Sequence, residues 1–175
     1  TVVNNVETLA AAIGILINGP EKFAAIGNKK SAGTKLVCLD SFFNNPGVYE
    51  IDMGTSMKKI FNEIGGGYKE PIKAFQIGGP LGGVVPLNEI DNLNLDFQEF
   101  GSKGFMLGHA SVVSIPKDFP MTEYIHHLFE FSAEESCGKC FPGRLGSYRG
   151  KEMFDQAKKK TAKIPLKLLN ELLVT

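Results

Sequence analysis

The stretches KLVCL at residues 35–39 and VYEI at residues 48–51, joined through NNPG at residues 44–47, decide the fold of the first half of this chain. Both flanking stretches are apolar and β-prone, and the Asn-Pro-Gly cluster is typical of a turn. The pattern therefore predicts an antiparallel hairpin.

The segments after this hairpin alternate between helical and strand patterns. Met57, Ile60, Phe61 and Ile64 share one helical face, and the glycines at 65–67 end that helix. β-prone runs follow at 72–77, 84–85 and 110–115, with a glycine-rich corner at 78–83 and a polar connector at 86–104. This order predicts a β-grasp domain, whose sheet the last run completes or flanks.

Both ends of the chain carry helical periodicity. An amphipathic helix is expected from Val6 to about Asn18, where Asn-Gly-Pro supplies a stop. Beyond Pro116, helical patterns occur at 124–132, 146–159 and 165–174. The predicted fold class is thus α+β: a ubiquitin-like β-grasp domain followed by a partial helical bundle.

Composition excludes several classes of protein. The chain has 175 residues, 43% of them apolar, and 19 basic residues balance 19 acidic ones, which predicts no affinity for nucleic acid. No apolar run reaches the length of a membrane span, and three cysteines do not make a secreted disulfide framework, so a cytoplasmic protein without membrane insertion is expected. A start at Thr1 without Met and an end inside a helical pattern predict a segment of a longer protein.

The pair Cys137 and Cys140, in Cys-Gly-Lys-Cys, is the strongest chemical signal. Thiolates three positions apart can converge on zinc or an iron–sulfur centre, but two thiolates leave either site two ligands short. A structural pair remains an alternative, and a thioredoxin-like role is disfavoured because the pair lies late in the chain, after a helix.

The other candidates carry weaker signals. Cys38 is expected to be a small buried hydrophobe within its strand. Of His126 and His127, one is expected at the edge of the core and one in solvent, because neighbours on a helix point about 100° apart. Lysines 158–160 and 163 are expected to form a solvated face, and the corner at 78–83 a tight turn rather than a phosphate loop.

Four motifs in order carry a family resemblance: TVVNNVETL at 1–9, NPGVYE at 45–50, GGPLGG at 78–83 and ESCGKC at 135–140. Together they resemble the NADH-binding flavoprotein subunits of respiratory complex I, NAD-linked iron hydrogenases and NAD-dependent formate dehydrogenases. The resemblance implies three parts: the C-terminal end of an FMN-binding domain at 1–30, an SLBB β-grasp domain at 33–115 and part of a helical 4Fe-4S domain at 117–175.

By this resemblance, the parent subunit is an NADH dehydrogenase or diaphorase-type oxidoreductase that passes electrons from NADH through FMN to a 4Fe-4S cluster. The chain by itself is expected to be inactive. Asn4, Asn5 and Thr8 would bind the flavin's phosphate and ribityl chain. The alternative for Asn5 and Thr8 is capping of the first helix.

The cluster motif is incomplete in this sequence. Cys137 and Cys140 match the family's first two ligands, Gly143 stands in place of the third cysteine, and the fourth would follow several dozen residues on. Two rival hypotheses therefore remain: a non-catalytic β-grasp and helical assembly module with a degenerate cluster site, and a zinc scaffold completed by outside ligands.

The resemblance also implies partners and a location. The partners would be other subunits of a multi-subunit oxidoreductase, among them a ferredoxin-like 2Fe-2S subunit. The location would be cytoplasmic, at the inner face of a membrane through those partners.

Overall fold

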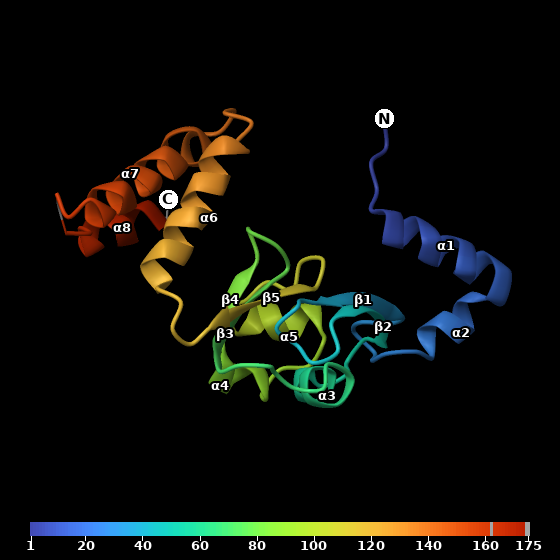
Figure 1. The fold of residues 1–175 in the computed structure, drawn as a ribbon. Helices are drawn as coiled ribbons and strands as arrows, with labels where there is room; N and C mark the ends of the chain where they lie inside the picture. The colour runs from blue at the N-terminus through green and yellow to red at the C-terminus, as the bar shows by residue number, and fades with distance from the viewer. Residues whose placement is uncertain (162, 174–175) are drawn as a thin grey trace. The chain divides into compact units, whose positions relative to one another are not determined.

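The computed structural model describes residues 1–161 and 163–173 of the chain (Figure 1). These residues form two compact units, one of residues 1–117 and one of the described residues from 118 to 173. Each unit is described by itself.

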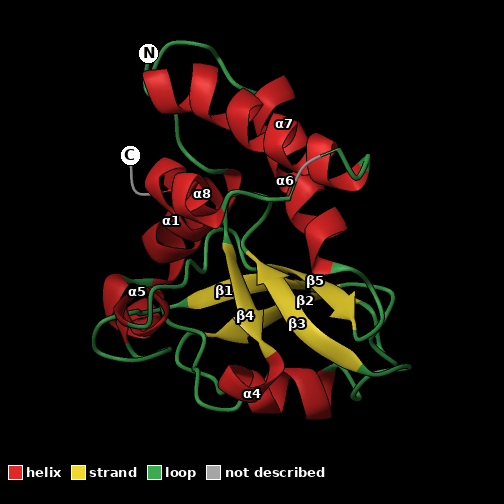
Figure 2. Cartoon of the chain, turned by 90° about the vertical axis from the view of Figure 1, so that its left-hand side faces the viewer, coloured by secondary structure: helices red, strands yellow, loops and turns green. Residues whose placement is uncertain are grey.

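The first unit contains one five-stranded sheet in the order β2-β1-β5-β3-β4 (Figure 2). The antiparallel pairing of β1 with β2, from Thr34 opposite Asp52 to Leu39 opposite Gly47, confirms the predicted hairpin. The central strand β5 runs parallel to β1 and antiparallel to β3, which completes the β-grasp order and confirms the predicted α+β class. The strands are β1 (Thr34–Leu39), β2 (Gly47–Asp52), β3 (Ile72–Ile77), β4 (Gly83–Pro86) and β5 (Ser111–Pro116).

The helix predicted over 57–64 is confirmed, as α3 (Met57–Lys59) continued by the π-helical turn η1 (Ile60–Ile64). The connector predicted at 86–104 is wrong in part, because it contains the short helices α4 (Leu87–Ile90) and α5 (Phe97–Ser102). Helices of four and six residues are too short to show periodicity, so the sequence pattern did not reveal them.

The core lies on one face of the sheet. Val37, Leu39 and Phe75 from the strands are fully or almost fully buried against Phe61 of η1 and Phe100 of α5. The Phe61 and Phe75 ring centroids are 4.8 Å apart and tilted, a favourable aromatic geometry.

Cys38 does not belong to this core, and its predicted burial is wrong. Strand side chains alternate between faces, and Val37 and Leu39 take the core face, so Cys38 points to the other one. Its thiol is exposed there, next to the paired residue Val48.

Two helices precede the sheet: α1 (Val6–Asn18) and α2 (Pro20–Ala24). Gly19, with φ at 91°, ends α1 as the sequence predicts, and its N–H donates to the Ile15 carbonyl at 2.8 Å. In the part of the chain that the structure describes, no residue of α1 is buried. Leu16, for example, keeps 86% of its surface exposed.

The second unit is helical, with α6 (Met121–Glu134), η2 (Pro142–Gly146), α7 (Ser147–Lys158) and α8 (Leu166–Leu173). Its core is small and contains Met153, Phe154 and Leu169. The predicted helices at 146–159 and 165–174 are confirmed within a residue or two, although Val174 lies outside the described residues. The lysines at 158–160 and 163 are exposed, as predicted.

Gly150 explains how closely α6 and α7 approach. A Cβ at this position would lie 2.2 Å from the Phe129 ring of α6, so only glycine fits. The two helices run antiparallel, as two side-chain pairs show: Glu130 pairs with Lys151, and the earlier residue His126 pairs with the later residue Asp155.

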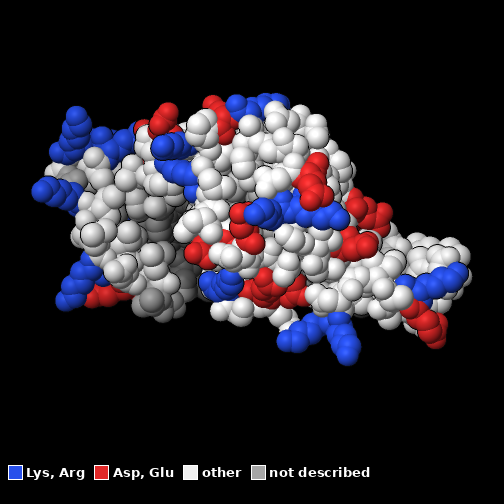
Figure 3. Space-filling view, turned by 90° about the horizontal axis from the view of Figure 1, so that it is seen from below, with Lys and Arg blue, Asp and Glu red and all other residues white. Residues whose placement is uncertain are grey.

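Within the described part of the chain, no helix has the length and apolar character needed to cross a membrane. Acidic and basic side chains are intermixed over the middle of the face drawn in Figure 3. This mixing agrees with the formal net charge of zero.

Candidate metal-binding loop

The two cysteines lie in the loop that joins α6 to η2. Helix α6 ends at Glu134, and the next helical segment begins beside Phe141. Cys137 and Cys140 are both exposed. Their thiols are thus accessible at the end of an antiparallel helix pair.

Two backbone features shape this loop. Gly138 has φ at 69°, a left-handed conformation that costs other residues about 1–2 kcal/mol. Its N–H donates to the Ser136 hydroxyl oxygen at 3.2 Å. The Cys140 carbonyl accepts the Arg144 N–H at 3.0 Å and so begins the following helix.

Side-chain pairs between α6 and α7 hold the two ends of the loop together. Glu130 and Lys151 form an ion pair at 2.9 Å, and His126 contacts Asp155 at 2.8 Å. The hydrogen bond from Lys151 lowers the pKa of Glu130, and the same bond raises the pKa of Lys151. His126 is largely covered whereas His127 is exposed, which confirms the division predicted for this pair.

Gly143 occupies the position where the family motif has a third cysteine. A Cβ built at Gly143 would lie 3.3 Å from the Cys140 sulfur and 3.0 Å from the Ser136 hydroxyl oxygen. A cysteine side chain at 143 would therefore start in the same small space that the Cys140 thiol borders. Gly143 itself leaves that space without a thiol.

The fit of this loop to a 4Fe-4S cluster is therefore partial. Cys137 and Cys140 supply the donor type that such clusters use. Among residues 1–161 and 163–173, no group of three or more His, Cys, Asp or Glu side chains is placed to hold a metal ion. The described residues offer two thiolates, not the four of a complete thiolate site.

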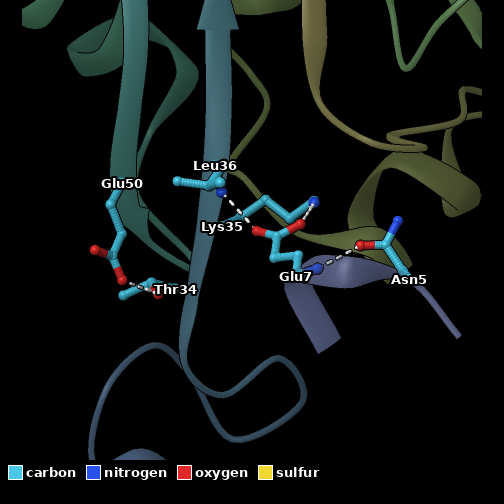
Figure 4. A network of polar contacts seen from close by, with 6 residues as sticks. All are labelled: Asn5, Glu7, Thr34, Lys35, Leu36 and Glu50. Carbon is cyan, nitrogen blue, oxygen red and sulfur yellow. Dashed lines mark hydrogen bonds and ion pairs between the residues drawn. The ribbon is translucent and has the colours of Figure 1, made fainter. Parts of the chain in front are cut away.

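The candidate flavin residues lie at the start of α1. Asn4, Asn5 and Thr8 are all exposed. The Asn5 side-chain oxygen accepts the Glu7 N–H at 2.8 Å, so Asn5 caps α1 (Figure 4). Thr8 lies inside the helix and caps nothing there.

Glu7 connects α1 to the sheet. Its carboxylate accepts the Leu36 N–H at 2.7 Å and pairs with the Lys35 ammonium (Figure 4). Burial raises the pKa of Glu7, but the hydrogen bonds from Lys35 and Leu36 and the Lys35 charge outweigh burial and leave this pKa below its ordinary value. No local sequence pattern predicts this network, since Glu7 and Lys35 are 28 residues apart.

A groove of about 890 Å³ lies within the first unit, between α1–α2 and the β1–β2 edge. Its lining is mostly apolar and includes Phe23 and Leu36. Asn5 lines the groove, whereas Asn4 and Thr8 are not among its lining residues. Of the three residues predicted to bind the flavin, only Asn5 thus lines this groove.

Comparison with known proteins agrees with these features. Residues 123–175 match the family described as the NADH-ubiquinone oxidoreductase-F iron-sulfur binding region. Over 148 residues, 83% of this chain, the sequence is 40% identical to the F 2 subunit of NADH-quinone oxidoreductase from Rhizobium meliloti. The chain is thus similar, over most of its length, to NADH-quinone oxidoreductase F subunits.

Relatives of the chain also include hydrogenase subunits. The chain is 36% identical over 161 residues, 91% of its length, to the NADP-reducing hydrogenase subunit HndC of Solidesulfovibrio fructosivorans. It superimposes on a chain of NAD+-reducing [NiFe]-hydrogenase in the H2-reduced state with a TM-score of 0.85 and 29% identity, covering 99% of this chain and 29% of that one. The chain spans about a third of the length of the curated relatives it matches, 33% of HndC and 35% of the Rhizobium protein.

Proposed function

We propose that this chain is part of the NADH-oxidising flavoprotein subunit of an NAD(H)-linked oxidoreductase, in which electrons pass from NADH through FMN to a 4Fe-4S cluster. The observation that carries the proposal is the exposed Cys137–Cys140 loop inside the segment that matches the iron–sulfur binding region. The chain alone would not oxidise NADH, since the nucleotide sites would lie in the rest of the subunit.

In this proposal Cys137 and Cys140 hold the cluster. A bound 4Fe-4S cluster accepts and releases single electrons. The chain's own contribution is positional: Gly138 turns the backbone between the thiols, and the α6–α7 pair fixes both ends of the loop. Lys139 and Arg144 add two positive charges to the segment that contains the thiols.

The N-terminal residues have a separate proposed role. We assign 1–30 to the end of an FMN-binding domain, 33–115 to an SLBB domain and 117–175 to the cluster domain. Asn4, Asn5 and Thr8 would then provide uncharged hydrogen-bonding groups to the flavin's phosphate and ribityl chain. All three residues are exposed at the start of α1, which supports the assignment, and the Asn5 side-chain oxygen also caps the helix.

The proposed setting is a multi-subunit complex. Relatives named as subunits of quinone oxidoreductases and hydrogenases support partner subunits for this chain. We propose that one partner is a ferredoxin-like 2Fe-2S subunit, and that the protein is cytoplasmic and attached to the inner face of a membrane through its partners.

Iron and acid-labile sulfide per chain test the proposal. The protein is the full-length subunit purified without oxygen, with Gly143→Cys purified alongside. About four iron and four sulfide in the unmodified protein would support the electron-transfer subunit. Zinc is measured in the same samples, and zinc in place of iron would support the zinc scaffold instead.

Gly143 also favours a second candidate, a non-catalytic β-grasp and helical assembly module with a lost cluster. No metal in the unmodified protein and a full complement in Gly143→Cys would support this module. The same result would count against electron transfer through this loop.

A further inference from the structure

The two cysteines of the α6–η2 loop, Cys137 and Cys140, are free thiols, and both are exposed. The third cysteine of the chain, Cys38, lies in the first unit. Among the described residues, no group of three or more His, Cys, Asp or Glu side chains is placed to hold a metal ion. Two thiols are nevertheless sufficient for a different reaction, the formation of a disulfide, which needs no further ligand.

The loop folds back on itself between Ser136 and Cys140. The Ser136 hydroxyl oxygen lies 3.0 Å, and the Cys140 sulfur 3.3 Å, from one point, the position that a Cβ of residue 143 would occupy. Extended backbone would instead separate these two residues by about 13 Å. Cys137 directly follows Ser136, so the same fold-back places Cys137 near Cys140. A disulfide needs such proximity, since its two Cα atoms lie within about 7 Å of each other.

Two glycines leave room for the thiols to approach each other. Gly138 has φ at 69°, so the backbone turns between the two cysteines. Gly143 has no side chain, and among the described residues, apart from the adjacent backbone, the Ser136 oxygen and the Cys140 sulfur are the atoms within 4 Å of its Cβ position. The Cys140 side chain therefore has space beside Gly143 in which to change its rotamer.

We propose that Cys137 and Cys140 form a reversible disulfide in the subunit without metal, by exchange with a small aliphatic disulfide such as oxidised glutathione. First, one cysteine sulfur bonds to a glutathione sulfur, the S–S bond of oxidised glutathione breaks, and one reduced glutathione leaves with the proton of that cysteine. The other cysteine then attacks the mixed disulfide, and a second reduced glutathione leaves with its proton. The two thiols lose two electrons, and the small disulfide gains them.

The disulfide does not depend on the proposed function, because it forms in a loop that holds no cluster. Its consequence is a redox switch, since two sulfurs bonded to each other are no longer thiolates that bind metal. In a reducing compartment, such bonds are usually transient and serve catalysis or the sensing of oxidants. The bond changes the state of the loop itself and reduces no other protein, which distinguishes it from a thioredoxin-like role.

Peptide mapping of the full-length subunit tests the proposal. The protein is freed of metal with a chelator and incubated with mixtures of reduced and oxidised glutathione, and the remaining thiols are alkylated. Trypsin cleaves after Lys139, between the two cysteines, so the peptides 118–139 and 140–144 separate unless a disulfide joins them. Mass spectrometry without reductant measures the joined fraction. Cys38, an exposed thiol in the other unit, is the internal reference.

The two peptides should be half joined at a concentration of oxidised glutathione at least about tenfold lower than the concentration that half modifies Cys38, because the second thiol reacts within the same chain. Excess reduced glutathione should separate the peptides again. Cys137→Ser and Cys140→Ser are the matched variants. Each should carry glutathione on its remaining loop thiol and show no joined peptides.

Three results would overturn the proposal. The first is glutathione on both loop cysteines of the unmodified protein without joined peptides. The second is joining only at the concentration that also modifies Cys38. The third is a disulfide between two copies of the chain, seen as a dimer in electrophoresis without reductant. None of these results alters the iron and sulfide content that tests the proposed function, so the two proposals can fail separately.

Discussion

At the scale of single residues, the glycines of the second unit divide according to what a side chain would meet. A Cβ at Gly150 would collide with the Phe129 ring at 2.2 Å, whereas one at Gly146 would meet the Leu172 side chain at an ordinary 3.4 Å. Phe129 cannot simply turn away, since its ring stacks on Phe154 at a centroid distance of 5.7 Å. Close packing of α6 on α7 thus depends on the missing side chain at position 150.

Gly150→Ala should destabilise the helical unit. The collision should cost about 1–3 kcal/mol, which exceeds the roughly 0.5–1 kcal/mol that alanine contributes through its helix propensity. Urea unfolding followed by far-UV circular dichroism measures the difference. Gly146→Ala is the matched control and should be neutral or slightly stabilising; equal stability of the two variants would contradict the packing argument.

Asp96 is a buried carboxylate with local partners at the start of α5 and a distant partner, Asn28, 68 residues earlier in the chain. Burial raises the pKa of Asp96, but hydrogen bonds from the Asn28 side chain and from the N–H groups of Glu99 and Gln98 outweigh burial, and the pKa lies below its ordinary value. Asp96 thereby caps α5, the helix that contributes the buried Phe100 to the core.

Asp96→Ala should lower the free energy of unfolding by about 1–2 kcal/mol, the usual cost of losing an N-cap. Asp96→Asn keeps an acceptor oxygen for the same N–H groups and should lose less. Urea unfolding at neutral pH compares the two variants. Equal losses in the two variants would show that charge rather than capping decides the effect, since both remove the carboxylate charge.

At the scale of elements, α1 is attached to the sheet by polar contacts rather than by a buried apolar face. Among the described residues, none in α1 is buried. The helix contacts β1 through Glu7, whose carboxylate forms an ion pair with the Lys35 ammonium and accepts the Leu36 N–H. An attachment of this kind depends on the charge of one carboxylate. It should therefore weaken in acid.

The pH dependence of this attachment follows from the lowered pKa of Glu7. The contribution of Glu7 is present above its ordinary pKa of 4.5 and is lost as the pH falls through the lower pKa of the folded state. At about pH 7, Glu7→Gln should be less stable than the unmodified chain by under about 1 kcal/mol, and the gap should close in acid.

Unfolding curves of both proteins between neutral and acidic pH measure this gap. Glu63→Gln changes an exposed glutamate outside the network and serves as the control. If the difference in stability between the two proteins instead grew as the pH fell, the proposed contribution of the Glu7 charge would be contradicted.

At the scale of the whole molecule, the two units have cores of very different size. The first unit surrounds its sheet with a large apolar cluster, whereas the core of the second contains Met153, Phe154 and Leu169 with a few half-buried neighbours. A small buried apolar area supports only a small free energy of unfolding.

Backbone amides of α6 and α7 should therefore exchange with solvent faster than those of β1, β3 and β5. Hydrogen exchange followed by mass spectrometry of the intact chain measures both sets in one sample. A single exchange rate for both sets, at the free energy of global unfolding, would show that the units unfold together.

The sequence determined the elements that have a local signal. Turn chemistry at Asn44–Gly47 predicted the hairpin, helical spacing predicted α6 and α7, and the Cys-Gly-Lys-Cys spacing indicated the candidate metal-binding loop. These features depend on contacts within a few residues, so a linear pattern contains them.

The tertiary structure decided what depends on residues distant in sequence. Cys38 lies on the exposed face of β1 because Val37 and Leu39 lie on the core face. Glu7 of α1 forms an ion pair with Lys35 of β1 although the two residues are far apart in sequence. The tertiary structure also placed the Ser136 oxygen and the Cys140 sulfur beside the space above Gly143. Such arrangements depend on which surfaces pack together and how the backbone turns between them, and no periodicity or spacing in the chain records either.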